Sequence, residues 1–404
     1  MMRRLVIVGG GQAGGRVAQI VSNAGRDFEI TLISSEAHPP YNRPPLSKGV
    51  LLGTSELADC LIWREHDLAW QGVDLVANVS AAVLEIGNKA VQTSTGQAIS
   101  YDKLVIATGS YVREFSVPGS HNHGVHSLRT FDDAKKIGKH FSKGKRLIVV
   151  GGGFIGLEVA AAARLRGMSV LVVEASDRLL ARIAPRRLSE AVALHHHAAG
   201  VNFRFGSMIE RFAADASGAL KSAHLSTGET IPCDVAVVGT GVSANTSLAK
   251  SAGLTVEGGI ITDSGLRTSH SDIYACGDCA SFWHPLFERH IRVEAWRNAE
   301  DHARIVSASL LGQEVGGNSV PFFWSDQYDW SIQIVGLPHL GSSAVTRHIG
   351  DAFILYHLDV AGRLIGATGF GKAEIIGREI RRANHWISER LNPDLKALEN
   401  GMLD

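Results

Sequence analysis

This chain of 404 residues has few cysteines, few prolines and no net charge. Four cysteines are too few for a disulfide framework in a protein of this length, so they favour a reducing compartment. Forty Lys and Arg balance forty Asp and Glu, which excludes an overall field that would attract nucleic acid or an anionic membrane. With 45% hydrophobic residues and only 11 prolines, the composition is that of a folded α/β protein and not of a disordered or fibrous one.

Long apolar runs are absent as well. A membrane-spanning helix needs roughly 18 apolar residues in a row, whereas runs such as 147–150 end at a glycine. Two arginines precede the apolar residues 5–8, but a stretch of four is too short for the apolar core of a signal peptide. We therefore expect a cytoplasmic protein, with neither membrane nor nucleic acid as a partner, that begins directly with its first strand.

Glycine, in contrast, is abundant, and the 44 glycines include two copies of one pattern. In each copy a short apolar strand leads into a G-x-G-x-x-G turn, a helix rich in small residues and a second apolar strand. The first copy comprises strand 5–8, Gly9, Gly11 and Gly14, a helix to about residue 24 and strand 28–33; the second comprises strand 147–150, Gly151, Gly153 and Gly156, a helix to about residue 166 and strand 169–173.

The spacing of these glycines has a mechanical reason. The first glycine permits the tight strand-to-helix turn, the second lets the backbone approach a pyrophosphate, and the third lets helix and strand pack closely. The N-terminus of the helix then faces the phosphate charge. One such turn is weak evidence, because glycine turns also serve ordinary strand–helix connections, but two copies between strand and helix predict two dinucleotide sites.

The residues after each second strand distinguish the two sites. Glu174 stands where a carboxylate accepts hydrogen bonds from both ribose hydroxyls of NAD and repels a 2′-phosphate, which favours NADH over NADPH. Arg178 lies nearby and would accept a phosphate, so a role for NADPH stays open. In the first copy the equivalent position is Ser34, and the nearest acid, Glu36, is the candidate ribose carboxylate there.

The remaining pattern predicts the domain organisation. Two further apolar strands, 103–106 and 235–238, are followed by glycines and connect one nucleotide domain to the other. Beyond Pro321, short alternating strands (331–335, 353–358 and 364–368) and a helix over about 372–391 indicate a separate α+β domain. The predicted fold is α/β, with two Rossmann-like dinucleotide-binding domains plus a C-terminal α+β domain.

Four stretches carry a resemblance to a known family: PYNRPPLSK (40–48), ATG (107–109), IYACGD (273–278) and FWSDQY (323–328). With them the chain resembles, over essentially its full length, the FAD-dependent ferredoxin reductases of bacterial oxygenase systems, which are glutathione-reductase-like flavoproteins. The resemblance implies an FAD-binding domain formed by 1–112 and 243–318, an inserted NAD-binding domain over 113–242 and the α+β domain over 319–404.

The resemblance also implies roles for single residues. Arg43 would bind the FAD pyrophosphate, because its fork of donors matches phosphate oxygens. Lys48 would lie beside the flavin N5 and O4 and pair with Glu158, since a buried lysine without a partner is costly; these two are the candidate catalytic residues. Asp278 resembles the acid that binds the ribityl hydroxyls, the alternative being a surface turn.

Two tryptophans complete the expected flavin site. The resemblance places Trp296 and Trp324 near the isoalloxazine, although both would equally serve as core aromatics. The expected FAD ligands are Gly9, Gly11, Gly14, Glu36, Arg43, Lys48, Ala107, Thr108, Gly109, Asp278, Trp296 and Trp324. The expected NADH ligands are Gly151, Gly153, Gly156, Glu158, Glu174 and Gly241, and no metal site is expected.

The reaction implied by the resemblance passes a hydride from NADH to tightly bound FAD and then single electrons to a [2Fe-2S] ferredoxin of the Rieske or putidaredoxin type. That ferredoxin would serve a ring-hydroxylating dioxygenase or a haem-thiolate monooxygenase, as in aromatic hydrocarbon catabolism. The alternatives are a rubredoxin reductase, an NADH oxidase, or a redox switch of the apoptosis-inducing-factor type. Either a monomer or a homodimer is compatible with the sequence.

Three other signals are given structural interpretations. Cys276 and Cys279 have C-x-x-C spacing, but they overlap the ribityl-binding motif, so we do not expect a redox dithiol. Histidines 195–197 are consecutive, and neighbours on a helix point about 100° apart and do not converge on a metal, so we expect a solvated helix face, as for the loop 121–123. Lys372, Arg378, Arg381 and Arg382 form a basic cluster that is either a solvated face or, with Arg297, a surface that steers an acidic ferredoxin.

Overall fold

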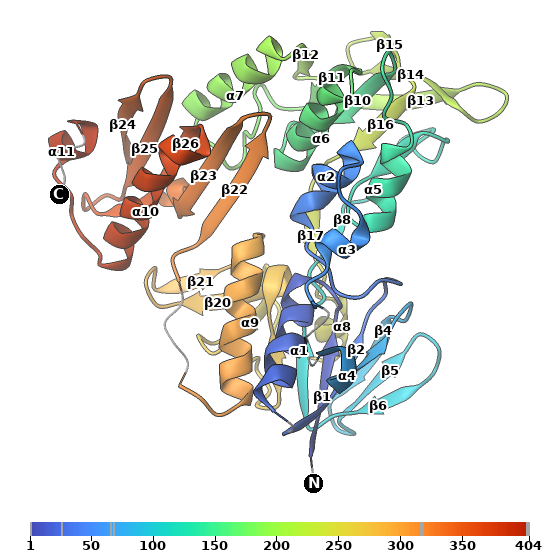
Figure 1. Ribbon diagram of the computed structural model, residues 1–404, viewed down its shortest axis with the longest axis vertical. Helices are drawn as coiled ribbons and strands as arrows, with labels where there is room; N and C mark the ends of the chain where they lie inside the picture. The colour runs from blue at the N-terminus through green and yellow to red at the C-terminus, as the bar shows by residue number, and fades with distance from the viewer. Residues whose placement is uncertain (1, 26, 65–66, 68, 315–318, 401–404) are drawn as a thin grey trace. The chain divides into compact units, whose positions relative to one another are not determined.

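The computed structural model describes residues 2–25, 27–64, 67, 69–314 and 319–400 and divides the chain into two compact units (Figure 1). The first unit consists of Met1–Arg43, Leu57–Tyr111 and Ser243–Phe322. The second consists of Pro44–Glu56, Val112–Val242 and Phe323–Asp404. Among the described residues, none of the helices combines the length and apolar character that crossing a bilayer requires.

The first unit is built on a five-stranded parallel sheet. Its strands lie in the order β19 (Ile273–Ala275), β7 (Lys103–Ile106), β1 (Arg3–Val8), β2 (Phe28–Ile33) and β3 (Val73–Val76). Helices α1 (Gln12–Ala24) and α9 (Trp296–Leu310) pack against each other beside it. The central strands are apolar because both faces of the sheet are covered.

Smaller sheets complete this unit. An antiparallel sheet of β4 (Ala81–Glu85), β5 (Ala90–Thr93) and β6 (Ala98–Ser100) shares a hydrophobic core with the large sheet, to which α8 (Ser247–Ser251) also contributes. Another sheet joins β18 (Ile260–Thr262), β20 (Ala280–His284) and β21 (Arg289–Ile291). The short helices are α3 (Leu57–Cys60), α4 (Ala69–Gly72) and η2 (Gly277–Cys279).

The second unit contains another five-stranded parallel sheet of the same construction. Its order is β12 (Val201–Phe205), β11 (Ser169–Glu174), β10 (Arg146–Val150), β16 (Val235–Val238) and β9 (Val125–Ser127). The helices α5 (Phe131–Gly138), α6 (Phe154–Leu165) and α7 (Arg186–Ala198) belong to it. An antiparallel sheet of β13 (Ile209–Ala214), β14 (Leu220–Leu225) and β15 (Thr230–Pro232) packs on its apolar face.

The same unit holds the C-terminal α+β region. Its sheet runs in the order β22 (Phe322–Gln327), β23 (Trp330–Gly336), β26 (Leu364–Gly371), β25 (Ala352–Leu358) and β24 (Ser343–Ile349). Helix α10 (Ala373–Ser388) packs on this sheet, and α11 (Leu395–Asn400) lies against β24. The remaining short elements of the chain are η1 (Pro44–Ser47), α2 (Gly49–Leu52), β8 (Ser110–Val112), β17 (Val242–Ala244) and η3 (Pro338–Leu340). The predicted fold class, with two dinucleotide-type domains and an α+β domain, is confirmed.

Candidate functional site

The first glycine turn, in the first unit, leaves space at one of its three glycines. A Cβ on Gly9, whose φ is +117°, would lie 2.2 Å from the Ala107 carbonyl oxygen, and one on Gly14 would lie 2.0 Å from the Gly9 oxygen. Both positions therefore need glycine for the packing of the protein itself. A Cβ on Gly11 would meet only the Arg43 guanidinium, at 3.7 Å, among the described residues. The open space at Gly11 thus lies in front of the N-terminus of α1, a position suited to a pyrophosphate.

The second glycine turn shows the same asymmetry. A Cβ on Gly151 would lie 2.5 Å from the Gly239 oxygen, and one on Gly156 would lie 2.3 Å from the Gly151 oxygen. Around Gly153, in contrast, no atom of the described residues lies within 4 Å of a Cβ position. Internal packing thus explains the first and third glycines, whereas the second leaves room for the close approach of a ligand, as a dinucleotide site requires.

Glu174, at the end of β11, is held in place by the backbone. One carboxylate oxygen accepts the Gly152 N–H at 2.6 Å, and the other accepts the Ser176 N–H at 2.8 Å. Each oxygen keeps a second acceptor position for a ribose hydroxyl. Arg178 donates to Ala184 O, Ser189 Oγ and Ala181 O at 2.7–2.8 Å. Because these donors are engaged by its own loop and by Ser189 of α7, the geometry favours NADH over NADPH.

Glu36 and Arg43 form an ion pair beside the first glycine turn. The Arg43 guanidinium donates to Glu36 Oε1 at 2.6 Å, and the Tyr41 hydroxyl donates to the other oxygen. Burial opposes the charge on Arg43, but Glu36, Tyr41 and Asp278 together raise the pKa of its guanidinium above the ordinary value. From the sequence we expected Glu36 at the ribose and Arg43 at the pyrophosphate of FAD. Their ion pair was not predicted.

Asp278 lies in the 3₁₀ turn η2, which a buried histidine supports. Ser110 Oγ donates to Asp278 Oδ2 at 3.1 Å, and the Gly277 N–H, at a φ of +76°, donates to His302 Nδ1 at 3.1 Å. Burial, and then the neighbouring His284, lower the pKa of His302 to about 3, so its imidazole is neutral and accepts this bond. Sequence reasoning missed His302, and its only local signal is a place on the buried face of α9.

The ATG segment follows β7 and continues the same site. The carbonyl of Ala107 faces Gly9, and Thr108 Oγ1 donates to Asn245 O at 2.6 Å. Gly109, at a φ of +63°, accepts the Asn245 N–H at 2.8 Å. In the second unit, Gly241 has a φ of +102° after β16. Both segments thus hold turn glycines at the ends of strands that run parallel to the glycine-turn strands.

The two tryptophans are half-buried. Trp296 begins α9 in the first unit and donates its indole N–H to Asn42 Oδ1 at 2.9 Å. Trp324 lies on β22 in the second unit. Neither side chain is enclosed in a core, which disfavours the alternative that both are core aromatics.

Lys48 and Glu158 are brought together within the second unit. Lys48 Nζ lies 2.7 Å from Glu158 Oε2, with side-chain exposures of 28% for the lysine and 5% for the glutamate. The Ser47 hydroxyl donates to the same oxygen, and Ser325 Oγ donates to Oε1 at 2.5 Å. The glutamate is therefore hydrogen-bonded on both oxygens, whereas the lysine keeps part of its surface accessible. Their catalytic role remains a prediction.

The cysteines have the properties of structural residues. The structure describes all four, Cys60, Cys233, Cys276 and Cys279; each is buried and none forms a disulfide. Burial raises the pKa of the Cys276 and Cys279 thiols, and Cys279 Sγ donates to the Ile106 and Cys276 carbonyls. Neutral, enclosed thiols are poor nucleophiles.

The prediction of a solvated face for histidines 195–197 was wrong at His196. The C-terminal sheet packs on α7, so that His196 has no exposed surface and its Nε2 lies 2.8 Å from Gln327 Oε1. His195 stacks on Trp330 with ring centroids 4.9 Å apart, and His197 is exposed. Within the part of the chain that the structure describes, no group of His, Cys, Asp and Glu is arranged to hold a metal.

The basic cluster is only partly available to a partner. Lys372, Arg378 and Arg381 are exposed on or beside α10, whereas Arg382 pairs with Glu379 at 3.5 Å. Arg297 of the first unit pairs with Asp301 at 3.0 Å.

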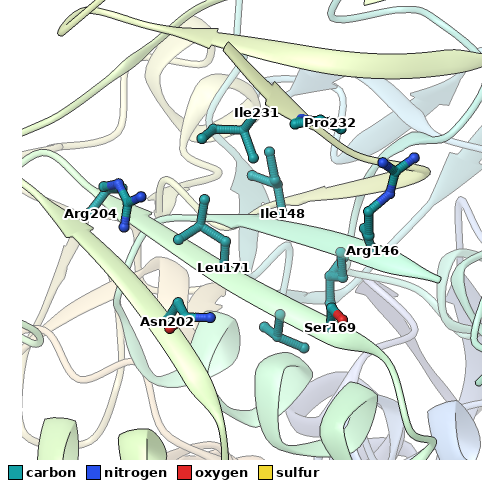
Figure 2. A pocket seen from close by; sticks show the side chains of 10 residues that line it. Arg146, Ile148, Ser169, Leu171, Asn202, Arg204, Ile231 and Pro232 are labelled. Atoms are coloured by element: carbon teal, nitrogen blue, oxygen red, sulfur yellow. The ribbon is translucent and has the colours of Figure 1, made fainter. Parts of the chain in front are cut away.

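A cavity of about 380 Å³ lies on the parallel sheet of the second unit, beneath β15 (Figure 2). Arg146 and Ser169, where β10 and β11 begin, line it, whereas the glycine turn follows the opposite end of β10. Its arginines are neutralised, since Arg146 pairs with Asp234 and Arg204 pairs with Glu229. This cavity is therefore separate from the nucleotide turn and lacks a free recognition charge among its described lining residues.

Comparison with known proteins agrees with this geometry. Residues 3–303 match the family model described as pyridine nucleotide-disulphide oxidoreductase, and residues 322–404 match the one described as reductase C-terminal. The ferredoxin–NAD(+) reductase component of an anthranilate 1,2-dioxygenase system from Burkholderia cepacia is 36% identical, covering 97% of this chain and 96% of its own. A rubredoxin–NAD(+) reductase from Ectopseudomonas oleovorans is 34% identical, with coverages of 82% and 86%.

Among solved structures, the reductase in a covalent putidaredoxin reductase–putidaredoxin complex is similar, with a TM-score of 0.93 and 30% identity. The match covers 98% of this chain and 95% of that one. The fold, the two glycine turns and the sequence matches all indicate the same family, and the matches cover nearly the whole chain. The chain therefore belongs to the pyridine nucleotide-disulphide oxidoreductase family and carries a reductase-type C-terminal domain.

Proposed function

We propose that this protein is an NADH-dependent flavoprotein reductase that passes electrons from NADH through FAD to a small [2Fe-2S] ferredoxin of an oxygenase system. The observation that carries the proposal is the pair of glycine turns. In each, the middle glycine is unexplained by internal packing, and Glu174 follows the second of them. The relative from Burkholderia cepacia, a ferredoxin–NAD(+) reductase component, supports the choice of acceptor.

The residues present fit FAD in the first unit. Gly11 leaves room for the pyrophosphate, with the Arg43 guanidinium beside it, and Asp278 offers a carboxylate for ribityl hydroxyls. Glu36 holds Arg43 and would serve the ribose side of the same cofactor. Bound FAD would supply chemistry that nicotinamide lacks, since it takes up two electrons together and releases them singly.

NADH would bind at the second glycine turn. Gly153 leaves the α6 N-terminus open to the pyrophosphate, and Glu174 orients the ribose. Lys48 would provide the positive charge that favours reduction of the flavin, and Glu158 would fix the direction in which its ammonium points. No residue is needed as a general base, because a hydride transfer requires alignment of the donor and acceptor and not proton abstraction.

The competing functions are less well supported. A peroxidase-type NADH oxidase or a disulfide reductase needs an accessible cysteine, and all four cysteines are buried. A rubredoxin acceptor is the second candidate, because the rubredoxin–NAD(+) reductase from Ectopseudomonas oleovorans is similar over most of the chain. We also propose a cytoplasmic location, since none of the four cysteines, all of them described, forms a disulfide.

The test is cytochrome c reduction by the FAD-loaded protein. NADH and NADPH are compared, each with a Rieske-type ferredoxin, a putidaredoxin-type ferredoxin, a rubredoxin or no carrier. The proposal expects a rate that depends steeply on one ferredoxin and on NADH. The same rate without any carrier would contradict it, and a rate that depends on rubredoxin alone would favour the second candidate.

A further inference from the structure

Strand β22 carries polar side chains where apolar ones are expected. Along this strand the inward positions include Ser325 and Gln327, which are 0% and 1% exposed, whereas Asp326 between them is exposed. A strand with one buried face normally places apolar residues there. Polar groups in such a place cost free energy unless every one of them is hydrogen-bonded.

These side chains form a continuous hydrogen-bonded row that ends at Glu158. His196 Nε2 lies 2.8 Å from Gln327 Oε1, Gln327 Nε2 lies 3.1 Å from Ser325 Oγ, and Ser325 Oγ lies 2.5 Å from Glu158 Oε1. The other oxygen of Glu158 faces Lys48 Nζ at 2.7 Å. The row thus connects α7 and β22 with the glutamate of α6, all within the second unit (Figure 1).

The chemistry of the groups fixes the direction of each hydrogen bond. A carboxylate only accepts, so the Ser325 hydroxyl donates to Glu158 and must accept from the Gln327 amide. The Gln327 oxygen also only accepts, so His196 donates through Nε2–H. Burial lowers the pKa of His196 to about 4, which agrees with a neutral imidazole that has one donor. Its Nδ1 then has no hydrogen-bond partner among the described residues. Every donor in the row points toward the glutamate.

We propose that Ser325 and Gln327, backed by His196, are positioning residues that fix the carboxylate of Glu158 and, through it, the ammonium group of Lys48. This rests on the proposed function, in which Lys48 supplies charge to the reduced flavin. If only Lys48 and Ser47 held it, the Glu158 carboxylate could rotate about its terminal torsion. The ammonium group of Lys48, whose side chain is partly exposed, would then shift with the carboxylate oxygen that it contacts. The row removes that freedom by occupying the second oxygen.

A merely structural role, fastening β22 to α7, makes a different prediction. In that case loss of the Ser325 hydroxyl would lower stability and leave the reduction of the flavin unchanged. Ser331 offers a matched control, because it is also a buried serine of the C-terminal sheet, 2% exposed, but its hydroxyl has no hydrogen-bond partner among the described residues.

The experiment compares the FAD-loaded wild-type protein with Ser325→Ala, Gln327→Met and Ser331→Ala. Anaerobic stopped-flow measurements give the limiting rate of flavin reduction per bound FAD and the dissociation constant of NADH. The flavin midpoint potential and the thermal unfolding midpoint are measured alongside. The same Ser325→Ala substitution is then made in a Glu158→Gln background.

We expect Ser325→Ala to lower the limiting rate about tenfold, because a hydrogen bond to a charged group is lost, without weakening NADH binding. The flavin midpoint potential falls as the Lys48 charge becomes less well fixed. Gln327→Met lowers the rate about threefold through its loss of support for Ser325, and Ser331→Ala leaves rate and potential unchanged. In the Glu158→Gln background, Ser325→Ala adds less than about a twofold further loss.

Two results would overturn the proposal: a rate and potential of Ser325→Ala that match those of Ser331→Ala, or the same fold-loss with and without the Glu158 charge. Should Ser325→Ala not retain FAD, Gln327→Met decides by the same two readouts. No ferredoxin is present in this assay. Failure of the proposed function would appear here as a wild-type flavin that NADH does not reduce, or, in the separate cytochrome c assay, as a reduced flavin that no carrier reoxidises. Failure of the positioning role would appear here as variants equal to wild type.

Discussion

His302 accepts a hydrogen bond from the backbone N–H of Gly277 at 3.1 Å, and the next residue is Asp278, the candidate ligand of the ribityl chain. The histidine is 1% exposed and packs edge-on against Phe282, with ring centroids 4.3 Å apart. Its ring is therefore fixed, and the turn that presents Asp278 depends on it.

Replacing His302 is expected to weaken FAD binding. His302→Leu leaves the buried Gly277 N–H without its acceptor, which costs about 1–3 kcal/mol, so both FAD retention and the thermal midpoint fall. His302→Gln offers an amide oxygen to the same N–H and recovers part of the loss. Fluorescence titration of the apoprotein with FAD measures this, with exposed His121→Gln as the control. Unchanged FAD affinity in His302→Leu would contradict this role.

Alanine substitutions at Gly153 and Gly156 of the second turn are expected to have different effects. Gly156→Ala places a Cβ 2.3 Å from a backbone oxygen and destabilises the fold. Gly153→Ala meets open space and loses only the preference of the α6 N-cap for glycine, so its free energy of unfolding falls by no more than about 1 kcal/mol. Its Kd for NADH is nevertheless expected to rise about tenfold, or about 1.4 kcal/mol, because the methyl group would occupy the proposed pyrophosphate position. Thermal unfolding and NADH titration separate the two effects, and equal behaviour of the two variants would be inconsistent with this site.

Loss of the Glu174 carboxylate is expected to weaken NADH binding without creating an NADPH enzyme. Glu174→Ala would remove the charge-assisted hydrogen bonds proposed for the ribose, and we expect it to raise the KM for NADH about tenfold or more. The KM for NADPH improves little, since the Arg178 donors are engaged with Ala181, Ala184 and Ser189. The control is Asp177→Asn, an exposed acid of the same loop that pairs with Arg186. A preference of Glu174→Ala for NADPH would contradict this prediction, because it would show that Arg178 can leave its partners and bind the 2′-phosphate.

The buried histidine His196 is expected to lower the free energy of unfolding as the pH falls below neutrality. The pKa of His196 is lowered to about 4 in the folded chain, against an ordinary value of about 6.5. The unfolded chain therefore binds the extra proton first, so stability is full above about pH 6.5 and is lost as the pH falls toward 4. Between pH 8 and pH 5 this one group accounts for about 2 kcal/mol.

The thermal midpoint should accordingly fall between pH 7.5 and pH 5, and His196→Gln should reduce the size of that fall. The variant starts from a lower midpoint, because its side chain does not reproduce the imidazole contacts, but its decline with acid is shallower. An equal decline in variant and wild type would mean that His196 titrates normally in the folded chain.

Much of the fold could be predicted from local patterns. The two strand–glycine turn–helix–strand units were recognisable because each of their features depends on neighbours in the sequence. The same holds for the strands 331–335, 353–358 and 364–368, which the structure extends to Trp330–Gly336, Ala352–Leu358 and Leu364–Gly371. Strand β24 was not predicted, since it is an edge strand whose residues are mostly exposed or half-buried and show no apolar alternation.

Contacts between distant residues were beyond the sequence patterns. His196 and Gln327 are 131 positions apart, and neither neighbourhood signals the other. The solvated helix face was the natural interpretation of three consecutive histidines until the C-terminal sheet covered one of them. The Glu36–Arg43 pair was missed for a different reason, because each residue had been given a cofactor group as its partner.

The most direct test of the central claim is anaerobic reduction of purified [2Fe-2S] ferredoxin by NADH in the presence of catalytic amounts of the FAD-loaded protein, followed at the iron–sulfur absorbance. We predict complete reduction of one ferredoxin, with two molecules reduced per NADH consumed and a much slower reaction with NADPH. NADH that reduces the bound flavin but leaves every ferredoxin and rubredoxin oxidised would contradict the assignment of the protein as an electron-transfer reductase.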